Sequence, residues 1–417
     1  MVPHFFPQVY SCTAPITKIP LTGGFEALFS SLIDTTASTG YFGGHAVIIK
    51  FNLTTLAESG RLSVPGLPAG SWFGAAAFHP GQQYAYFIPR GGATNGIGRI
   101  VRVRLSDFSV QGVLEYGAVQ GQPKEAQAAA IEPNGRYLYV LVSSDSKRLE
   151  KFDLQTFTHV GGLVVADASN DNRNTVSIAT DAQGDFAYVG IDNQIIQVRL
   201  SSFLVTDRML VAGEGGGVPS FQQAMLDVAD GEGYFVNIQG PSMGTVMRMH
   251  LSAFKTVDQI FLGEHYVGSE WLGPVGAVDA QREIIYVSGY DDPLTLLAVR
   301  PDFRSVHKIS LESLKASGTD SLAPISMAFD STRNMIYLVV NSLTASIARI
   351  DVGQVQCGSA PLPIEPFCYG QGILECGQLT CSGAHSCTNT KTDRGGGCCS
   401  CGPDCDACSA DLLCRQP

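Results

Sequence analysis

Cysteine is the residue whose number and spacing most plainly predict chemistry in this sequence. The chain of 417 residues has 12 cysteines, and 11 of them fall within the last 61 residues. A short segment so rich in thiols cannot build a sizeable apolar core, so disulfides must hold it together, as is typical of an oxidising compartment. We therefore predict an extracellular protein, secreted or at a cell surface, with every cysteine paired. The cysteines are Cys12, Cys357, Cys368, Cys376, Cys381, Cys387, Cys398, Cys399, Cys401, Cys405, Cys408 and Cys414.

Metal binding is the alternative chemistry for such residues. Cys405 and Cys408 have the spacing of zinc ligands. Only one histidine, His385, accompanies them, and the ten cysteines of the tail are an even number, which favours disulfides. Residues 167–172 and 291–292 are rich in oxygen ligands that suit calcium, but neither segment has the spacing of an EF-hand. We expect no metal and no cofactor.

Nucleophilic catalysis has little support in the sequence. Neither a Gly-x-Ser-x-Gly motif nor a His-Glu-x-x-His motif occurs, and the eight histidines are scattered. His79 and His159 occupy positions of a repeat described below, which favours a structural role for both. We therefore expect no catalytic residue and a protein that is not an enzyme.

Charge and hydropathy limit the possible partners. The net charge is −11 and basic residues do not cluster, so we predict no nucleic-acid partner. No run of 18 apolar residues occurs, so we predict no membrane span. The first residues lack the features of a signal peptide, which we interpret as a signal already removed from a secreted chain. The sequon Asn52-Leu53-Thr54 makes Asn52 the candidate glycosylation site.

A repeated pair of residues indicates the elements that position these features. An acidic residue, or a histidine in its place, stands seven residues before a tyrosine in seven copies that are 45–53 residues apart. The pairs are Asp34/Tyr41, His79/Tyr86, Glu132/Tyr139, Asp181/Tyr188, Asp227/Tyr234, Asp279/Tyr286 and Asp330/Tyr337. A strand-only repeat of this period predicts a β-propeller with one blade per copy. We therefore predict an all-β protein, with a seven-bladed propeller over residues 1–355, a proline-rich linker over 356–367 and a disulfide-rich module over 368–417.

Each blade is predicted to have four antiparallel strands, so its loops divide between two faces. The turn between the first and second strands has a constant length, and the turn between the third and fourth is nearly fixed as Leu-x-x-Phe; we call this side the fixed-turn face. The remaining loops vary in length and form the variable-loop face, to which we assign binding. Large rings there anchor partners when exposed and fill gaps between blades when buried. The candidates are Trp72, Phe73, Tyr116, Phe221, His265, Tyr266 and Trp271.

The repeats resemble the YVTN/NHL-like family of propeller repeats across residues 16–355. The stretches TDAQGDFAYVGIDNQIIQVRLSSF and EPNGRYLYVLVSSDSKRLEKFDLQTF carry this resemblance. It implies the propeller fold, in a family that includes lyases, quinoprotein relatives and interaction scaffolds. Six cysteines of the tail loosely resemble an EGF-like module, which implies the pairs Cys376–Cys387, Cys381–Cys399 and Cys401–Cys414. Cys368, Cys398, Cys405 and Cys408 depart from that pattern.

The two ends of the propeller are predicted to meet. The seventh repeat supplies only three strands, whereas the strand at residues 16–21 has no blade of its own. A three-stranded blade would expose an edge, so we predict that residues 16–21 pair antiparallel with residues 348–352 as its outer strand. This pairing brings Cys12 close to Cys357, and we predict a disulfide between them. The alternative is that Cys12 pairs with a tail cysteine or with another chain.

Together these features favour a secreted, non-enzymatic structural or interaction protein. A rigid propeller joined to a cross-linked module suits self-association with other protein chains, which can propagate as a filament. The architecture resembles flagellar-hair (mastigoneme) and cell-surface structural proteins of protists, which implies a structural role. Glycans are a second class of partner that we consider. The alternative function is an extracellular propeller enzyme, lyase-like or quinoprotein-like, or a lectin, acting on a small ligand.

Overall fold

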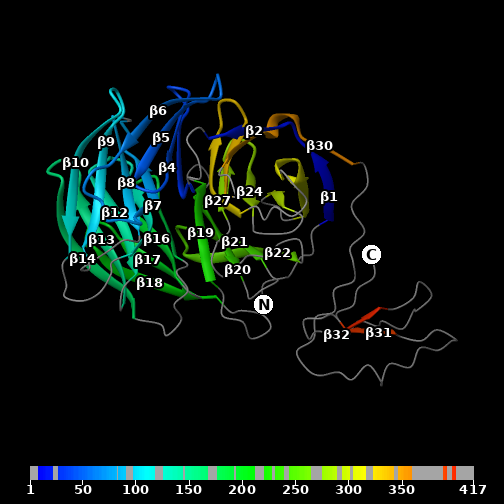
Figure 1. Ribbon diagram of the computed structural model, residues 1–417. Helices are drawn as coiled ribbons and strands as arrows, with labels where there is room; N and C mark the ends of the chain where they lie inside the picture. Colours follow the sequence, from blue (N-terminus) through cyan, green and yellow to red (C-terminus); the bar gives the residue numbers. More distant parts are fainter. Residues whose placement is uncertain are drawn as a thin grey trace.

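The computed structural model is all-β (Figure 1). Among the residues that it describes, the helical segments are two 3₁₀ turns, η3 (Glu312–Leu314) and η4 (Val352–Gln354), and no helix there is long or apolar enough to cross a bilayer. The described residues are 8–21, 27–81, 83–90, 97–117, 125–143, 146–167, 176–191, 194–211, 220–227, 231–238, 244–263, 275–288, 294–300, 304–315, 323–341, 346–358, 388–391 and 397–400.

Seven antiparallel sheets follow one another along the chain. Blade one contains β3 (Ser30–Asp34), β4 (Thr39–Gly43), β5 (Val47–Asn52) and β6 (Ala57–Ser63). Blade two contains β7 (Trp72–Phe78), β8 (Tyr84–Arg90), β9 (Gly98–Arg104) and β10 (Ser109–Tyr116). Blade three contains β11 (Glu125–Ile131), β12 (Tyr137–Ser143), β13 (Ser146–Asp153) and β14 (Thr158–Asp167). Blade four contains β15 (Val176–Thr180), β16 (Phe186–Ile191), β17 (Gln194–Arg199) and β18 (Leu204–Leu210).

The last three blades complete the ring. Blade five contains β19 (Ser220–Asp227), β20 (Glu232–Ile238), β21 (Gly244–His250) and β22 (Lys255–Gly263). Blade six contains β23 (Val275–Asp279), β24 (Ile284–Ser288), β25 (Thr295–Val299) and β26 (Ser305–Ser310), and blade seven contains β27 (Ala323–Asp330), β28 (Met335–Asn341), β29 (Ser346–Asp351) and β2 (Ile16–Pro20). The inner strands of consecutive blades contact each other, and β27 contacts β3, so the seven-bladed propeller predicted from the repeats is confirmed.

The N-terminal strand closes blade seven as predicted. β2 pairs antiparallel with β29, with Ile16 opposite Ile350 and Pro20 opposite Ser346. Lys18 Nζ donates to the carbonyl of Leu314 at 2.9 Å, which ties β2 to η3 of the preceding blade. In Figure 1, β2 lies in dark blue beside the yellow strands of the seventh repeat. The predicted disulfide between Cys12 and Cys357 is also present, so the ring is closed by hydrogen bonds and by a covalent bond.

The structure corrects one part of this interpretation, because the N-terminal segment contains two strands rather than one. β1 (Gln8–Thr13) pairs in parallel with β26, so it adds a fifth strand to the outer edge of blade six. The two-residue strand β30 (Gln356–Cys357) then pairs antiparallel with β1. Residues 8–20 therefore join blades six and seven instead of completing only one blade.

The repeated tyrosines form the packing between blades. All seven are at most 2% exposed, and burial raises the pKa of Tyr41 and Tyr86 to about 12. Each of the first four tyrosines contacts the phenylalanine that ends the Leu-x-x-Phe turn of the next blade. The pairs are Tyr41–Phe108, Tyr86–Phe157, Tyr139–Phe203 and Tyr188–Phe254, with ring centroids 5.9–6.3 Å apart.

The same four phenylalanines have a left-handed backbone, with φ between 43° and 53°. Such a conformation is uncommon for a bulky residue and persists only where the surroundings hold it. A cation from the preceding blade covers three of these rings: Lys50 lies 5.7 Å from Phe108, Arg102 lies 4.3 Å from Phe157 and Lys151 lies 5.5 Å from Phe203. The Leu-x-x-Phe turn is therefore a joint between neighbouring blades.

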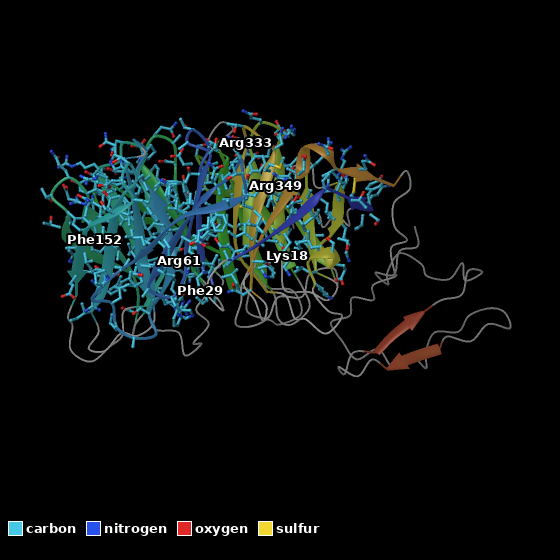
Figure 2. The ribbon with its side chains drawn as sticks, turned by 45° about the horizontal axis from the view of Figure 1, so that its top comes forward. Lys18, Phe29, Arg61, Phe152, Arg333 and Arg349 are labelled. Carbon is cyan, nitrogen blue, oxygen red and sulfur yellow. A yellow bond between two sulfur atoms is a disulfide. The ribbon has the colours of Figure 1, made fainter. Side chains whose placement is uncertain are left out.

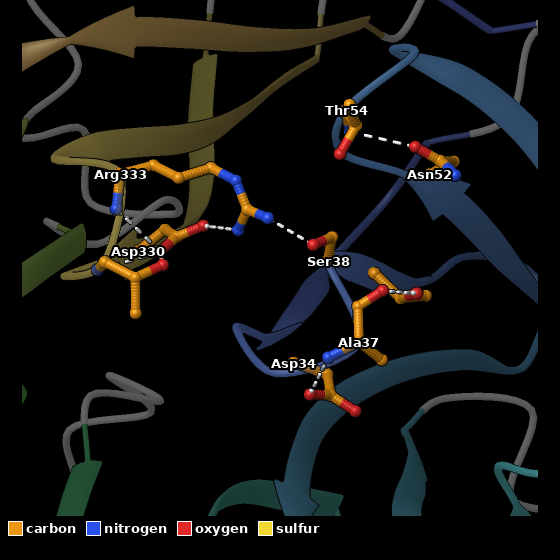
Figure 3. A network of polar contacts seen from close by, with 9 residues as sticks. Asp34, Ala37, Ser38, Asn52, Thr54, Asp330 and Arg333 are labelled. Atoms are coloured by element: carbon orange, nitrogen blue, oxygen red, sulfur yellow. Dashed lines mark hydrogen bonds and ion pairs between the residues drawn. The ribbon is translucent and has the colours of Figure 1, made fainter.

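The acidic residue of the repeat caps the turn between the first and second strands. The Asp330 carboxylate accepts hydrogen bonds from the backbone N–H of Thr332 and of Arg333 at 3.0 and 3.2 Å. It also accepts one from the guanidinium of Arg333 at 2.7 Å, and this guanidinium donates in turn to Ser38 of blade one (Figure 3). His79, which replaces the acid in blade two, accepts the N–H of Gly81 at 3.1 Å. These residues thus serve the fold, as the sequence predicted for His79.

Blade three contains a buried acidic side chain and a buried basic side chain, and their contribution to the stability of the fold can be tested by changing the pH. Glu132 and Lys151 are 4% and 9% exposed, and they interact electrostatically. Burial raises the pKa of Glu132 and lowers the pKa of Lys151. Because the folded-state pKa of Glu132 is raised, its contribution to stability is fully present below the pKa of the unfolded chain and is lost as the pH rises through the folded-state pKa.

We expect the wild type to gain stability relative to Glu132→Gln when the pH falls from 7 to 4. Urea unfolding of both proteins at the two pH values measures the difference. The variant keeps an acceptor oxygen for the N–H of Tyr137, which Glu132 binds at 3.2 Å, so the comparison isolates the charge. If the difference in unfolding free energy between the two proteins were the same at both pH values, or changed in the opposite direction, the raised pKa of Glu132 would be contradicted.

The tail contributes a small hairpin to the described residues. β31 (Thr388–Lys391) pairs antiparallel with β32 (Gly397–Ser400), which places Cys398 opposite Thr390 and Cys399 opposite Asn389. The other eight cysteines of the tail lie outside the described residues. The EGF-like pairs therefore stay a prediction, as does the division of the chain into propeller, linker and module.

Candidate functional site

The structure describes four of the seven residues that the sequence assigned to the variable-loop face. Trp72 begins β7, and Phe221 lies on β19. His265, Tyr266 and Trp271 lie outside the described residues, so their part in binding stays a prediction.

Phe73 and Tyr116 are not exposed anchors, which corrects their assignment to a binding surface. Phe73 is fully buried and packs against Phe87 with ring centroids 5.6 Å apart. Tyr116 is 4% exposed and packs against Phe152 of the next blade at 4.7 Å. The absence of a side chain at Gly98 makes room for it, since a Cβ there would lie 2.3 Å from the tyrosine ring. Both rings fill space inside and between blades.

Trp72 belongs to a group of four side chains on the variable-loop face, which we call the aromatic–cation cluster: Phe29, His45, Trp72 and Arg90. The ring centroid of Phe29 lies 5.3 Å from that of His45 and 5.6 Å from that of Trp72, and His45 and Trp72 are 6.2 Å apart. The guanidinium carbon of Arg90 lies 6.0 Å from the centre of the Trp72 ring. Three rings and one cation therefore converge at the junction of blades one and two.

Regular backbone pairing positions this cluster. The N–H of Phe29 donates to the carbonyl of Gly43 at 2.8 Å, and an isolated bridge joins His45 to Trp72 across the two blades. Trp72 and Arg90 face each other on adjacent strands. Trp72 and Arg90 stand at the variable-loop ends of β7 and β8, and Phe29 and His45 stand just beyond strand ends on the same face. Figure 2 shows Phe29 at this face, opposite the side that carries Arg333 of the fixed turns.

The cluster offers a surface for recognition. His45 is exposed, whereas Phe29, Trp72 and Arg90 are half-buried, so each ring is held by the scaffold and still open to solvent. Flat rings of this kind bury large areas of a partner at little entropic cost, and a neighbouring guanidinium can bind a carboxylate or another oxygen acceptor. The arrangement therefore suits binding of a protein side chain or of a sugar ring.

Sequence reasoning found Trp72 but missed Phe29, His45 and Arg90. His45 lies in the short connection between β4 and β5, next to Gly43 and Gly44, and the sequence placed it only in or near a third strand. The signal that could have found the group is positional: all four residues stand at the variable-loop ends of strands in two adjacent blades.

A second polar cluster lies on the third and outer strands of blade three, β13 and β14, beside Tyr116 at the end of the outer strand of blade two. The carboxylate of Glu150 is 1% exposed, and its two oxygens contact Arg148 Nε at 3.1 Å and His159 Nε2 at 2.9 Å. Burial and the nearby charge of Glu150 raise the pKa of Tyr116, whose ring lies 5.9 Å from that of His159. Because both carboxylate oxygens have partners within blade three, this cluster has the structural role expected for His159.

Asn52 ends β5, the third strand of blade one, and so lies at the fixed-turn face. Its side-chain oxygen accepts hydrogen bonds from the N–H groups of Thr54 and Thr55, both at 2.9 Å (Figure 3 shows the first). Glycosylation at this position stays a prediction.

The comparisons with known proteins support the fold. No family model and no curated protein matches the sequence. Among solved structures, the WD40 repeats of RRP9 are similar with a TM-score of 0.59 and 12% identity, over 82% of this chain and 99% of that one. Kuenenia stuttgartiensis hydrazine synthase is similar with a TM-score of 0.57 and 11% identity, over 82% of this chain and 98% of that one. At such identities the likeness establishes the β-propeller fold alone, and function has to be argued from this chain's own residues.

Proposed function

We propose that this protein is a secreted, non-enzymatic scaffold whose variable-loop face binds other protein chains, including further copies of itself, as a building block of an extracellular filament. The carrying observation is the aromatic–cation cluster, which presents Phe29, His45, Trp72 and Arg90 together on a rigid junction between two blades. Trp and Arg at the centre of a surface are the residues that most often dominate binding energy.

The covalent closure of the ring supports a structural role. A scaffold that transmits load between neighbours benefits from blades that cannot separate, and Cys12–Cys357 joins residues 345 positions apart. The disulfide also fits the proposed extracellular location, since such bonds persist in oxidising compartments. Glycosylation at Asn52 belongs to the same proposal.

The test is the concentration dependence of assembly. Analytical ultracentrifugation of the full chain should reveal self-association that weakens on replacement of Trp72 by alanine. Loss of a central aromatic anchor typically costs at least about 2 kcal/mol, so we expect the dissociation constant to rise about 30-fold or more.

Leu210→Ser provides the matched control. Leu210 ends β18, the outer strand of blade four, and is 72% exposed, so its replacement removes exposed apolar area away from the aromatic–cation cluster at the junction of blades one and two. We expect this variant to assemble like the wild type. A wild type that stays monomeric at all concentrations, or assembly lost in Leu210→Ser and kept in Trp72→Ala, would contradict the proposal.

Glycan binding is the second candidate function, favoured by the same three rings. Sugar rings stack on Trp and Phe, and the Arg90 guanidinium would select oxygen-rich or acidic sugars. Binding of the monomeric full chain to immobilised oligosaccharides, lost in Trp72→Ala, would favour this function over self-association.

A further inference from the structure

We propose that reduction of the closure disulfide converts it into a zinc site formed by Cys12, Cys357 and His307. The two sulfurs and a ring nitrogen of His307 all lie within 4.8 Å of one another. Zinc bound to two sulfurs at about 2.3 Å and one imidazole nitrogen at about 2.0–2.1 Å needs its ligand atoms about 3.5–3.8 Å apart. The three atoms are therefore already gathered within the volume that such a site occupies.

Three strands bring these ligands together. Cys12 lies opposite Cys357 in the ladder between β1 and β30. Tyr10, two residues before Cys12 on the same strand, lies opposite His307 in the parallel ladder between β1 and β26. The ring of Tyr10 meets that of His307 edge-on, with centroids 5.7 Å apart, and so limits how the imidazole can turn. The site therefore depends on β1, the N-terminal strand that the sequence analysis did not predict.

The chemistry balances with an external dithiol as reductant. The dithiol is oxidised to its own disulfide and delivers two electrons and two protons, which turns the bond between Cys12 and Cys357 into two thiols. Zn²⁺ then displaces one proton from each thiol, and neutral His307 donates a nitrogen lone pair. Cys12 is 2% exposed and held within the sheet, whereas Cys357 is exposed. Access for the reductant and the metal is therefore from the side of Cys357, and water supplies the fourth ligand.

The consequence is a closure with two interchangeable cross-links. Under oxidising conditions a disulfide joins β1 to β30, and under reducing conditions with zinc a metal bridge joins the same strands and adds β26. A ligand that binds only the folded state stabilises it, so the ring would stay clamped in either state.

Residue-specific alkylation tests this site without interference from the ten cysteines of the tail. The full chain is reduced with a phosphine, freed of metal, and treated with iodoacetamide with or without excess Zn²⁺, and modification of Cys357 is followed by peptide mass spectrometry. We expect zinc to slow alkylation of Cys357 at least tenfold in the wild type. His307→Gln should lose most of this protection.

Two further variants complete the test. His250→Gln removes an exposed histidine at the end of β21 in blade five and should keep the protection. Cys12→Ser leaves the fold a side chain of similar size and should lose it. If Cys357 reacts equally fast with and without zinc in the wild type, there is no site. If the protection survives in both His307→Gln and Cys12→Ser, these residues are not its ligands, and either result overturns the proposal.

Discussion

Replacing Cys12 and Cys357 together by alanine is expected to lower the free energy of unfolding of the propeller by about 4–5 kcal/mol. The disulfide closes a loop of 345 residues, and a cross-link over so long a loop removes much of the conformational entropy of the unfolded chain. For a domain of this size we expect the melting temperature to fall by roughly 6 °C. Denaturant unfolding of the oxidised proteins measures the free energy, and calorimetry measures the temperature.

The wild type treated with a reductant and a chelator is the companion measurement. It breaks the same bond without changing a side chain, whereas the double variant leaves the tail disulfides intact. Agreement between the two isolates the closure bond. A loss below about 1 kcal/mol in the double variant would mean that the pairing of β2 with β29 and the hydrogen bond from Lys18 to Leu314 are enough to close the ring.

The closure could be predicted because it follows from counting strands. The seventh repeat lacks an outer strand, residues 16–21 lack a blade, and antiparallel pairing leaves one place for Cys12. β1 could not be found in the same way. Its pattern over Gln8–Thr13 is weak, and its partner β26 lies almost 300 positions away in a parallel register that no repeat position announces. Whether the edge of blade six accepts a fifth strand depends on the tertiary structure, so the sequence of the strand alone does not predict it.

The candidate site was only partly predictable, for a reason of periodicity. Neighbouring residues of a strand point to opposite faces. Trp72 and Phe73 both looked like loop residues in the sequence, but β7 begins at Trp72, so Phe73 points into the core. A shift of one residue in the start of a strand thus separates a binding residue from a core residue. Phe29 and Arg90 come from other strands, and only the closed ring brings them beside Trp72.

The strongest repeat in the sequence proved to be structural, and this divides the molecule by role. The acid caps a turn, the tyrosine packs between blades, and the phenylalanine of the next blade receives it, all toward the fixed-turn face. Because the repeated residues serve turns and packing on the fixed-turn side, the loops of the other face can differ from blade to blade. Function is therefore better sought where the repeat stops, as in the aromatic–cation cluster.

Replacing Tyr139 by alanine is expected to destabilise the propeller by about 3–5 kcal/mol, as other buried aromatic truncations do. The side chain is fully buried, and its ring centroid lies 6.1 Å from that of Phe203 in blade four. Lys151 Nζ lies 5.6 Å from the same ring and 5.5 Å from the ring of Phe203, so one truncation removes packing for both residues. Urea unfolding of the variant and the wild type gives the difference.

Two controls separate the ring from its hydroxyl and from surface effects. Tyr139→Phe keeps the ring and loses only a long hydrogen bond to Glu132, at 3.5 Å, so we expect a loss of about 1 kcal/mol or less. Leu204→Ala changes the residue after Phe203, which is 58% exposed, and should change stability by less than about 0.5 kcal/mol. If Tyr139→Ala lowered the free energy of unfolding by no more than Tyr139→Phe does, packing of the ring would not stabilise the contact between blades three and four. The left-handed backbone of Phe203, whose ring contacts Tyr139 and Lys151, would then have to be held by its other apolar contacts in the same core.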